Sequence, residues 1–401
     1  MQNRRKFIKN SLLSTAVAGL TGRYCVTTGN ADDLPDNKFI YRTLGRTGIK
    51  LPIVSMGTGN TSNPALVKSA LNKGIKLLGT SEIYQNGNNE KMIGTAIKDL
   101  PRDSYMVMTS SGDLAWIDTE TGVLNNAFTY DGYLKRVKGS LSRLGIEYVD
   151  ILIQSFAAKR ESVFHEPVLK AMEYVKKEGL AKYTGIATHR NEPEAIRAAV
   201  DVGIHDVIMI SYNFLKTNRE ELEDAIRYAA SAGLGIIAMK TMAGAFWDKE
   251  RIKPINSRAA LKWVLQNENI HTTVPDCSDF DQLAQNIEIM SDLKLTGTEI
   301  RDLVPPTGEV TSSIFCQQCG ECLRQCPHGV DIPTLMRSYM YAYGHNNLPH
   351  AHYTLTSIGL TYNPCLECTT CNIHCSMGFD IRKKICDISR IIDIPRDFLH
   401  V

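Results

Sequence analysis

Residues 133–154 read YLKRVKGSLSRLGIEYVDILIQ and contain the unit that decides the fold. The first part, 133–144, places apolar residues at the three- and four-residue spacing of an amphipathic helix. The second part, 148–154, is a short apolar run of the kind that forms a buried strand. A helix of this length can cross over a parallel sheet between two strands. The stretch therefore predicts one helix–strand unit of an α/β fold.

The same alternation extends to both sides of this stretch. The predicted strands are 53–57, 76–80, 105–110, 148–154, 183–187, 207–212, 234–240 and 272–275. The predicted helices include 64–72, 133–144, 193–202, 219–232 and 257–267. Eight strand–helix units in about 250 residues are typical of a (β/α)8 TIM barrel with its active site at the C-terminal ends of the strands. We assign the barrel to residues 36–295.

Several segments of this region resemble the aldo-keto reductase family. They are YRTLGRTG at 41–48, MGTG at 56–59, TSEIY at 80–84, SLSRLGIEYVD at 140–150, GIATH at 185–189 and IIAMKTMAGA at 236–245. The segments stand in the family's order and on the expected elements. The resemblance implies a barrel that reduces carbonyls with hydride from NADP(H), with Tyr84 in the place of the catalytic proton donor.

The partners of that tyrosine differ from the family. The family's aspartate, lysine and histidine positions read Gly79, Ser110 and Ser155, with Gln154 as the alternative for the last. A free tyrosine has a pKa of about 10 and needs nearby positive charge to donate a proton near neutrality. Positioned acid–base groups are typically worth roughly a hundred- to ten-thousand-fold in rate. We therefore expect poor reduction by the usual route, and Tyr84 could equally be a hydroxyl that only lines the barrel mouth.

The expected nicotinamide site differs as well. The positions that clamp the carboxamide in the family read Ala187, Thr188 and Met209. The resemblance still implies cofactor contacts at Tyr212 for the nicotinamide ring, and at Lys240, Ser278 and Asn286 for the phosphates and adenosine. Gln282 replaces an arginine that often grips the adenosine phosphate. We expect NADP(H) to bind weakly if it binds at all.

A second module begins near residue 311, where the spacing C-x-x-C-x-x-C-x-x-x-C occurs twice. This is the bacterial ferredoxin spacing, in which three thiolates bind one 4Fe-4S cluster and the fourth binds the other. The pattern predicts a mainly helical two-cluster domain over residues 311–401. The predicted ligands are Cys316, Cys319, Cys322 and Cys375 for one cluster, and Cys365, Cys368, Cys371 and Cys326 for the other.

Structural zinc and disulfides are the alternatives for these cysteines. Zinc needs four ligands rather than eight, and a disulfide scaffold does not need the triple rhythm. Cys277 and Cys386 lie outside the pattern and are expected to be ordinary buried thiols. The long segment between the motifs, with a helical-looking stretch at 332–343, resembles the helical ferredoxin type that is fused to other oxidoreductases.

Residues 1–30 are predicted to be an export signal. The basic start with Arg4 and Arg5 precedes a weakly hydrophobic stretch at 11–20 that is too short to span a bilayer comfortably. It resembles the twin-arginine signal, which exports folded proteins and so suits clusters inserted in the cytoplasm. The expectation is a periplasmic protein that meets the twin-arginine translocation machinery. An uncleaved signal acting as a membrane anchor and a plain basic amphipathic helix stay open.

The composition narrows the choice of partners. A formal net charge of +2 shows no large excess of either sign, so we expect no nucleic-acid partner. The favoured function is an exported iron–sulfur oxidoreductase that exchanges electrons between a small polar or carbonyl-containing substrate and a redox partner protein. One alternative is an NADP(H)-dependent carbonyl reductase with prebound cofactor, although hydride carries two electrons and a cluster accepts one. The other is a non-catalytic electron-transfer or docking subunit.

Overall fold

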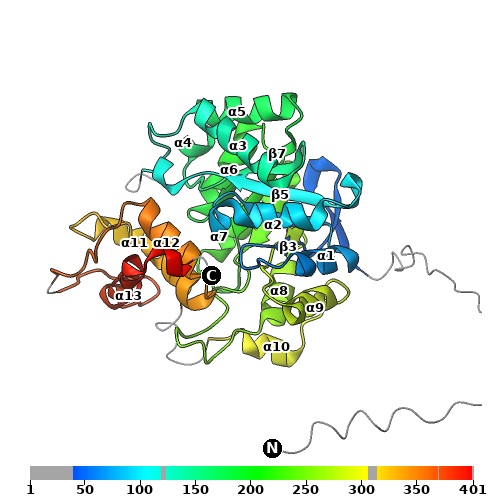
Figure 1. The fold of residues 1–401 in the computed structure, drawn as a ribbon. Helices are drawn as coiled ribbons and strands as arrows, with labels where there is room; N and C mark the ends of the chain where they lie inside the picture. The colour runs from blue at the N-terminus through cyan, green and yellow to red at the C-terminus, as the bar shows by residue number, and fades with distance from the viewer. Residues whose placement is uncertain (1–38, 119–122, 306–313, 369, 400–401) are drawn as a thin grey trace, which may run out of the picture. The chain divides into compact units, whose positions relative to one another are not determined.

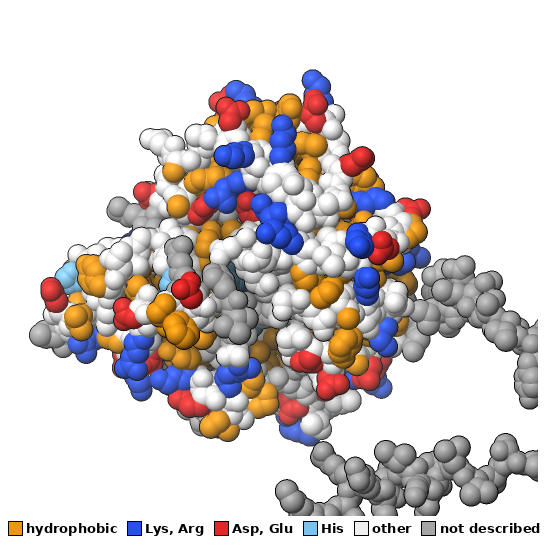
Figure 2. Space-filling model, in the orientation of Figure 1, with side chains coloured by type: hydrophobic (Ala, Val, Ile, Leu, Met, Phe, Trp, Pro, Cys, Tyr) orange, Lys and Arg blue, Asp and Glu red, His pale blue; other side chains and the backbone are white. Residues whose placement is uncertain are grey.

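The computed structural model describes residues 39–118, 123–305, 314–368 and 370–399. The predicted export signal at 1–30 lies outside these ranges. Within them, no helix is both long enough and apolar enough to cross a bilayer. On the face shown in Figure 2, basic and acidic side chains are interspersed.

Eight strands form one sheet in which each strand pairs with the next in chain order. They are β3 (Met56–Gly57), β4 (Leu77–Ser81), β5 (Met106–Ser111), β6 (Val149–Gln154), β7 (Ala181–Thr188), β8 (Val207–Ser211), β9 (Gly235–Met239) and β10 (Thr272–Thr273). All neighbouring pairs are parallel. Parallel bridges from Val54 to Thr273 and from Gly57 to Asp276 join the first strand to the last. The predicted eight-stranded parallel barrel is thereby confirmed (Figure 1).

The helices between the strands cover the outside of the sheet (Figure 1). They are α1 (Pro64–Asn72), α2 (Asn88–Ile97), α3 (Tyr130–Leu144), α4 (Arg160–Val163), α5 (Glu166–Lys177), α6 (Glu192–Val202), α7 (Arg219–Ser231), α8 (Ser257–Leu265), α9 (Phe280–Ile289) and α10 (Gly297–Asp302). Helix α3 shows how the sequence sets the ends. The Thr129 hydroxyl accepts a hydrogen bond from the backbone N–H of Gly132, and Gly145 ends the helix at φ 67°, in the left-handed region.

Alternation along each strand separates two apolar cores. On β6, Ile151 and Ile153 point into the barrel, whereas Leu152 packs against the surrounding helices. A short antiparallel hairpin, β1 (Tyr41–Thr43) and β2 (Lys50–Pro52), adds Leu44 and Leu51 to the interior core. The backbone N–H of Arg46 in this hairpin donates to the carbonyl of Gly233, just before β9. The hairpin therefore plugs the N-terminal end of the barrel and leaves the C-terminal end for a site.

The C-terminal region is mainly helical, as predicted. It contains α11 (Ile332–Tyr339), which continues as a π-helical turn over Met340–Gly344, then α12 (Leu348–Ser357) and α13 (Ile381–Ser389). Phe315 and Leu335 of this region share one apolar cluster with Ala243 and Trp247, which follow β9. At Gly344 the two backbones nearly touch, because a Cβ there would lie 2.4 Å from the carbonyl oxygen of Gly244. The C-terminal region is thus packed against the loop that follows β9.

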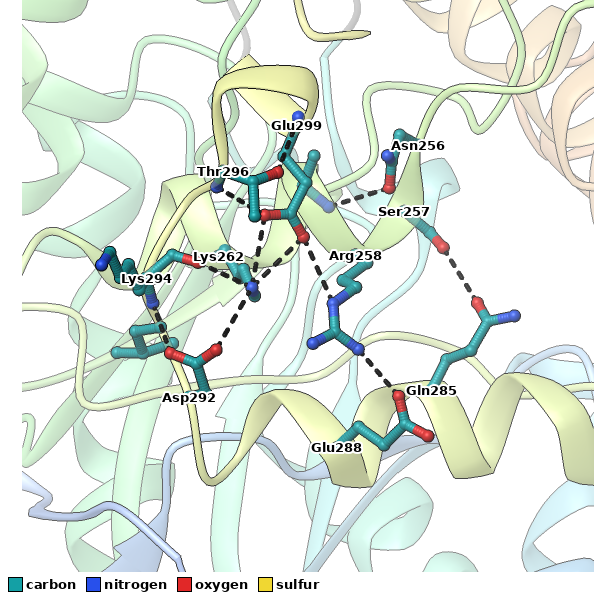
Figure 3. A network of polar contacts seen from close by, with 12 residues as sticks. Asn256, Ser257, Arg258, Lys262, Gln285, Glu288, Asp292, Lys294, Thr296 and Glu299 are labelled. Carbon is teal, nitrogen blue, oxygen red and sulfur yellow. Dashed lines mark hydrogen bonds and ion pairs between the residues drawn. The ribbon is translucent and has the colours of Figure 1, made fainter.

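A buried lysine ties three barrel elements together (Figure 3). Lys262 of α8 is 1% exposed, and its Nζ donates to the carbonyl of Lys294 at 2.8 Å and to the carboxylate of Glu299 on α10. Arg258 of α8 bonds the same carboxylate at 3.2 Å and also reaches Glu288 of α9 at 2.7 Å. The network fixes α10 against the barrel through charged groups rather than apolar ones.

We expect Lys262→Ala to lower the free energy of unfolding by about 2 kcal/mol, because it removes the side-chain donor to the Lys294 carbonyl and one of the donors to the buried Glu299 carboxylate. The change is measured as a shift of the denaturation midpoint at constant m-value. Lys170→Ala is the matched control, since its ion pair with Glu166 is exposed on both sides and should contribute nothing measurable. Equal stability of the two variants would show that the network is only a surface feature.

Candidate functional site

Tyr84 lies just after β4, at the end of the barrel opposite the hairpin plug. The backbone N–H of Gly59 donates to the Asp276 carboxylate at 3.0 Å, and a Cβ on Gly59 would lie within 3.4 Å of both Tyr84 and Asp276. Lys240 follows β9 at the same end of the barrel. Three side chains at the C-terminal ends of different strands therefore face one region, as expected for a barrel active site.

The C-terminal region adds side chains to the same place. The ring of His350 lies 5.4 Å from the ring of Tyr84 and stacks on Tyr341 at 4.0 Å. Lys240 donates from Nζ to the Tyr341 hydroxyl at 3.3 Å. We name Tyr84, Lys240, Asp276, Tyr341, His345 and His350 the mouth cluster. Half of its members come from the segment between the two cysteine motifs, so the barrel end is completed by the cysteine-rich region.

Sequence reasoning missed the three members from the C-terminal region. A signal was present, because residues 340–350 read MYAYGHNNLPH and gather tyrosine and histidine side chains in one short segment. Asn347 anchors that segment to the barrel by donating from Nδ2 to the Asn60 side chain at 2.6 Å. A run of aromatic and imidazole groups between two ligand motifs indicates a contact surface, although nothing local says what it contacts.

The surroundings of Tyr84 make it a weak acid. Burial raises the pKa of its phenol well above the usual range, and the nearby Asp276 and Tyr341 raise it further. Burial and the charge of Lys240 lower the pKa of His350 and of His345 to about 3, so both imidazoles are neutral near pH 7. A neutral imidazole does not supply the positive charge that would make Tyr84 a better proton donor.

The positions of the missing family partners carry small side chains. Gly79, Ser110 and Ser155 continue the inward-facing rows of β4, β5 and β6, in step with Leu77, Met108 and Ile153. Ser110 and Ser155 are both buried. Small groups stand where the aldo-keto reductase pattern has an acid, a cation and an imidazole, which leaves Tyr84 without those partners.

The predicted carboxamide clamp is apolar or occupied. Ala187 belongs to the interior core, and Met209 packs against it. The hydroxyl of Thr188 donates to the backbone carbonyl of Arg190 at 2.7 Å. None of the three offers a free hydrogen-bonding group to a carboxamide in this arrangement.

Of the predicted cofactor contacts, Lys240 lies in the mouth cluster and the others make different contacts. Tyr212 follows β8 on its outward side: its ring packs on Trp263 at 5.3 Å, and its hydroxyl donates to Glu223 at 2.7 Å. The hydroxyl of Ser278 donates to the carboxylate of Asp279, and Asn286 donates from Nδ2 to the thiol of Cys277. Cofactor roles for Tyr212, Ser278 and Asn286 stay predictions, since their side chains are engaged elsewhere.

The electrostatic neighbours of the thiols are consistent with the two predicted sets, and the assignment of the ligands to two clusters stays a prediction. Burial raises the pKa of the Cys316 thiol to about 12, and the neighbouring Cys319 and Cys375 add to the shift. Cys375 therefore lies beside the first motif. Burial likewise raises the pKa of the Cys365 thiol to about 11, and the groups that add to it include Cys368, Cys371 and Cys326. The fourth cysteine of each motif is thus close to the other motif, as a crossed arrangement requires.

Several features of these sets bear on metal binding. Four thiols in close proximity repel one another as thiolates, so positively charged iron would stabilise them. Within the described ranges, no three histidine, cysteine or acidic side chains surround a single-ion position. A cubane instead spreads its four thiolates over four iron atoms. Cys277 is buried, whereas Cys386 is half-buried near Cys365.

Two surface hollows lie away from this region. One of 440 Å³ is lined by residues of α3 and α5, including Tyr130 and Tyr174. The other, of 520 Å³, lies between Trp247 and Val304. Neither includes a mouth-cluster residue or a cysteine of the two motifs, and neither carries a set of groups suited to catalysis.

Comparisons with known proteins agree with this two-part arrangement. The family model described as "Aldo/keto reductase family" matches residues 58–259, and that described as "4Fe-4S dicluster domain" matches residues 315–379. L-galactose dehydrogenase of Arabidopsis thaliana is 26% identical over 321 residues, which cover 68% of this chain and 97% of that protein. The uncharacterized oxidoreductase YqkF of Bacillus subtilis is 25% identical over 288 residues, 64% of this chain and 90% of that protein.

Among solved structures, the holo form of the aldo-keto reductase AKR11C1 from Bacillus halodurans superposes with a TM-score of 0.52 and 20% identity. The match covers 66% of this chain and 95% of that one, so it supports the barrel fold. The family match extends over half of the chain and includes the strand ends that hold Tyr84 and Lys240. The chain therefore belongs to the aldo/keto reductase family and carries a 4Fe-4S dicluster domain after the barrel.

Proposed function

We propose that this protein is an exported iron–sulfur oxidoreductase. The barrel mouth binds a small polar or carbonyl-containing molecule, and two 4Fe-4S clusters pass electrons one at a time between that molecule and a redox partner protein. One observation carries the proposal: the dicluster domain supplies Tyr341 and His350 to the surroundings of Tyr84. The domain that carries the cluster cysteines therefore contributes side chains to the barrel mouth.

The two cysteine sets differ in their surroundings, which suggests an order of electron transfer. Beside Cys316, the Gln317 side chain accepts hydrogen bonds from the backbone N–H and the hydroxyl of Thr217, which follows β8. Beside Cys365, in contrast, Tyr362 and Leu366 are 70% and 73% exposed. The set with Cys316 would hold the cluster nearer the barrel, and the set with Cys365 would face the partner protein.

The relatives offer partial support for the substrate class. L-galactose dehydrogenase acts, by its name, on a small polar sugar with a carbonyl carbon. A second function, reduction with NADP(H), is favoured by the aldo-keto reductase from Klebsiella pneumoniae solved with NADPH, which shares the fold at a TM-score of 0.50 and 18% identity. Against it stand the apolar clamp positions Ala187 and Met209. The clusters are therefore the favoured route for electrons.

Metal analysis of anaerobically purified protein tests the proposal. We expect about eight irons and eight acid-labile sulfides per chain, and reduced protein should give the electron paramagnetic resonance of coupled 4Fe-4S clusters. Stoichiometric zinc with no brown colour would contradict it, because the cysteines would then be ligands of zinc. If the clusters form but no small molecule oxidises or reduces them, the protein is instead a docking or electron-carrying subunit.

Arg190 should tune the cluster nearer the barrel. This side chain follows β7, and its electrostatic neighbours are Asp331, Arg337 and the Cys322 sulfur. A positive charge beside a cluster stabilises the reduced form, which carries one more negative charge. We expect Arg190→Gln to lower the midpoint potential of one cluster by roughly 30 to 60 mV, a three- to tenfold change for one electron. Redox titration followed by electron paramagnetic resonance measures it, with the exposed Arg227→Gln as control.

Export depends on the N-terminal segment. Changing Arg4 and Arg5 together to Lys should leave folded, cluster-loaded protein in the cytoplasm, because the paired guanidinium groups are what the twin-arginine receptor recognises. Cell fractionation with iron analysis of each fraction measures this, and the change of Lys6 to Arg is a matched control that leaves the pair intact. Normal export of the double variant would refute the assignment of the signal.

A further inference from the structure

We propose that the barrel mouth binds a small organic anion, with its carboxylate held between Lys240 of the barrel and Arg337 of the dicluster domain. The inference rests on the proposed function and names the substrate class of the same site. A carboxylic acid that bears a carbonyl or hydroxyl group on the next carbon fits this arrangement.

The two cations have no ionic partner of their own. Arg337 is 7% exposed, its Nη2 reaches only the Thr334 hydroxyl at 3.4 Å, and its guanidinium lies 5.4 Å from the ring of Phe156. Lys240 bonds the Tyr341 hydroxyl. Among the described residues, no carboxylate lies within ion-pair distance of either. Burying a charge without a counter-ion is costly, so the buried Arg337, together with the half-buried Lys240, indicates a missing anion.

Lys216 and Glu192 show how a buried cation is usually neutralised, by a buried carboxylate. Lys216 is buried, as Arg337 is, and its Nζ lies 2.6 Å from the carboxylate of Glu192, which is also buried. The fold therefore provides an internal carboxylate for one lysine of this region and none for Lys240 or Arg337. Asp276 is close enough to Lys240 to feel its charge, but it bonds the backbone of Gly59 instead.

Two histidines lie near both cations. His189 and His350 each lie within electrostatic range of both Lys240 and Arg337. His189 continues the inward row of Tyr183 and Ala187, so it points toward the barrel mouth. Its Nδ1 is buried and has no hydrogen-bond partner. A buried ring nitrogen without a hydrogen-bond partner, near two cations without carboxylate partners, is suited to bonding an oxygen of the anion.

The backbone at the same strand ends is strained. Phe156, which follows β6 and contacts Arg337, has φ 64°, and Lys240 has φ 55°. Non-glycine residues adopt this left-handed region at a cost, and they do so mainly where the surrounding structure serves a function. Both strained residues meet the dicluster domain, so the strain coincides with the two walls of the proposed anion site.

The position relative to Tyr84 defines the rest of the ligand. His350 is an electrostatic neighbour of both cations, and the centroid of its ring lies 5.4 Å from that of the Tyr84 ring. A carboxylate beside His350 therefore places the adjoining carbon near the Tyr84 hydroxyl. Ser110 and Ser155, which are both buried, add two small hydroxyl groups above the interior core. The arrangement matches 2-oxo and 2-hydroxy acids better than long or neutral substrates.

Calorimetric titration of the anaerobically purified full chain with its clusters tests the inference. The probes are pyruvate and lactate, their neutral amides pyruvamide and lactamide, and inorganic phosphate. We expect at least one acid to bind roughly tenfold or more tightly than its amide, because only the acid neutralises the two cations. Equal binding of acid and amide, or no binding of either acid, would overturn the inference. Phosphate binding without acid binding would overturn the carboxylate assignment.

Variants locate the site. Arg337→Gln and Lys240→Gln should each weaken binding of the acid by roughly tenfold or more, and the exposed Arg227→Gln should not. If Arg337→Gln fails to assemble, Arg337→Lys keeps the charge and should retain part of the binding. If both variants keep their full iron content and bind the acid as tightly as the unmodified protein, only the proposed anion site is refuted. Absence of iron would instead refute the proposed function.

Discussion

Replacing Cys326 by Ser should remove the cluster bound by Cys365, Cys368 and Cys371 and leave the other cluster in place. We expect the iron content to fall from about eight to about four per chain, and the spectrum of reduced protein to lose the coupling between two clusters. The reason lies in the fold: Cys326 belongs to the first motif in sequence but is an electrostatic neighbour of Cys365.

The reciprocal variant and a control sharpen this test. Cys375→Ser should remove the cluster of the first motif, because Cys375 lies beside Cys316 and Cys322. Cys386→Ser, near Cys365 but outside the pattern, should leave both clusters in place. If Cys326→Ser instead loses the cluster of the first motif, each motif supplies all four ligands of its own cluster. The spectra of the two variants separate these outcomes, because each would retain a different single cluster.

Much of the barrel could be predicted because its signals are local. Period-two alternation places Ile151 and Ile153 inside and Leu152 outside whatever the rest of the chain does. The same rule accounts for Tyr212. Val207 and Met209 of β8 belong to the interior, so a residue of the opposite parity points outward to Trp263. The family resemblance implies a cofactor contact for Tyr212; the ring packs on Trp263 here, and the cofactor role stays a prediction.

The mouth cluster could not be predicted, because it joins parts of the chain that are far apart in sequence. Tyr84 and His350 meet only when the dicluster domain packs on the barrel. Helix α12 was also missed. Pro349 reads as a helix breaker, but at the first turn it is compatible with a helix, and the Asn347 side chain caps the start by accepting from the His350 N–H at 3.0 Å. Local patterns predict elements, and only packing decides which of their faces meet.

We expect weak NADPH binding and aldehyde turnover well below about one per second, a normal enzymatic rate. Burial, Asp276 and Tyr341 raise the pKa of the Tyr84 phenol, and the described contacts include no cation that lowers it. The interior positions that would clamp a carboxamide are apolar at Ala187 and Met209. Fluorescence titration with NADPH measures the weak cofactor binding, and assay of an aldehyde panel measures the slow turnover.

Restoring the family residues separates proton donation from cofactor binding. The triple variant Gly79→Asp, Ser110→Lys and Ser155→His rebuilds the surroundings of Tyr84, and the first change fits if Met108 yields slightly, since a Cβ at Gly79 would lie 3.3 Å from its methyl group. Activity should still be limited by NADPH binding. Adding Ala187→Ser, Thr188→Asn and Met209→Gln should then tighten binding of NADPH.

Micromolar NADPH affinity with turnover of about one per second in the unmodified protein would show that other residues, such as Lys240 or His350, have taken over these roles. The mouth cluster would then be a nicotinamide site rather than a site served by the clusters.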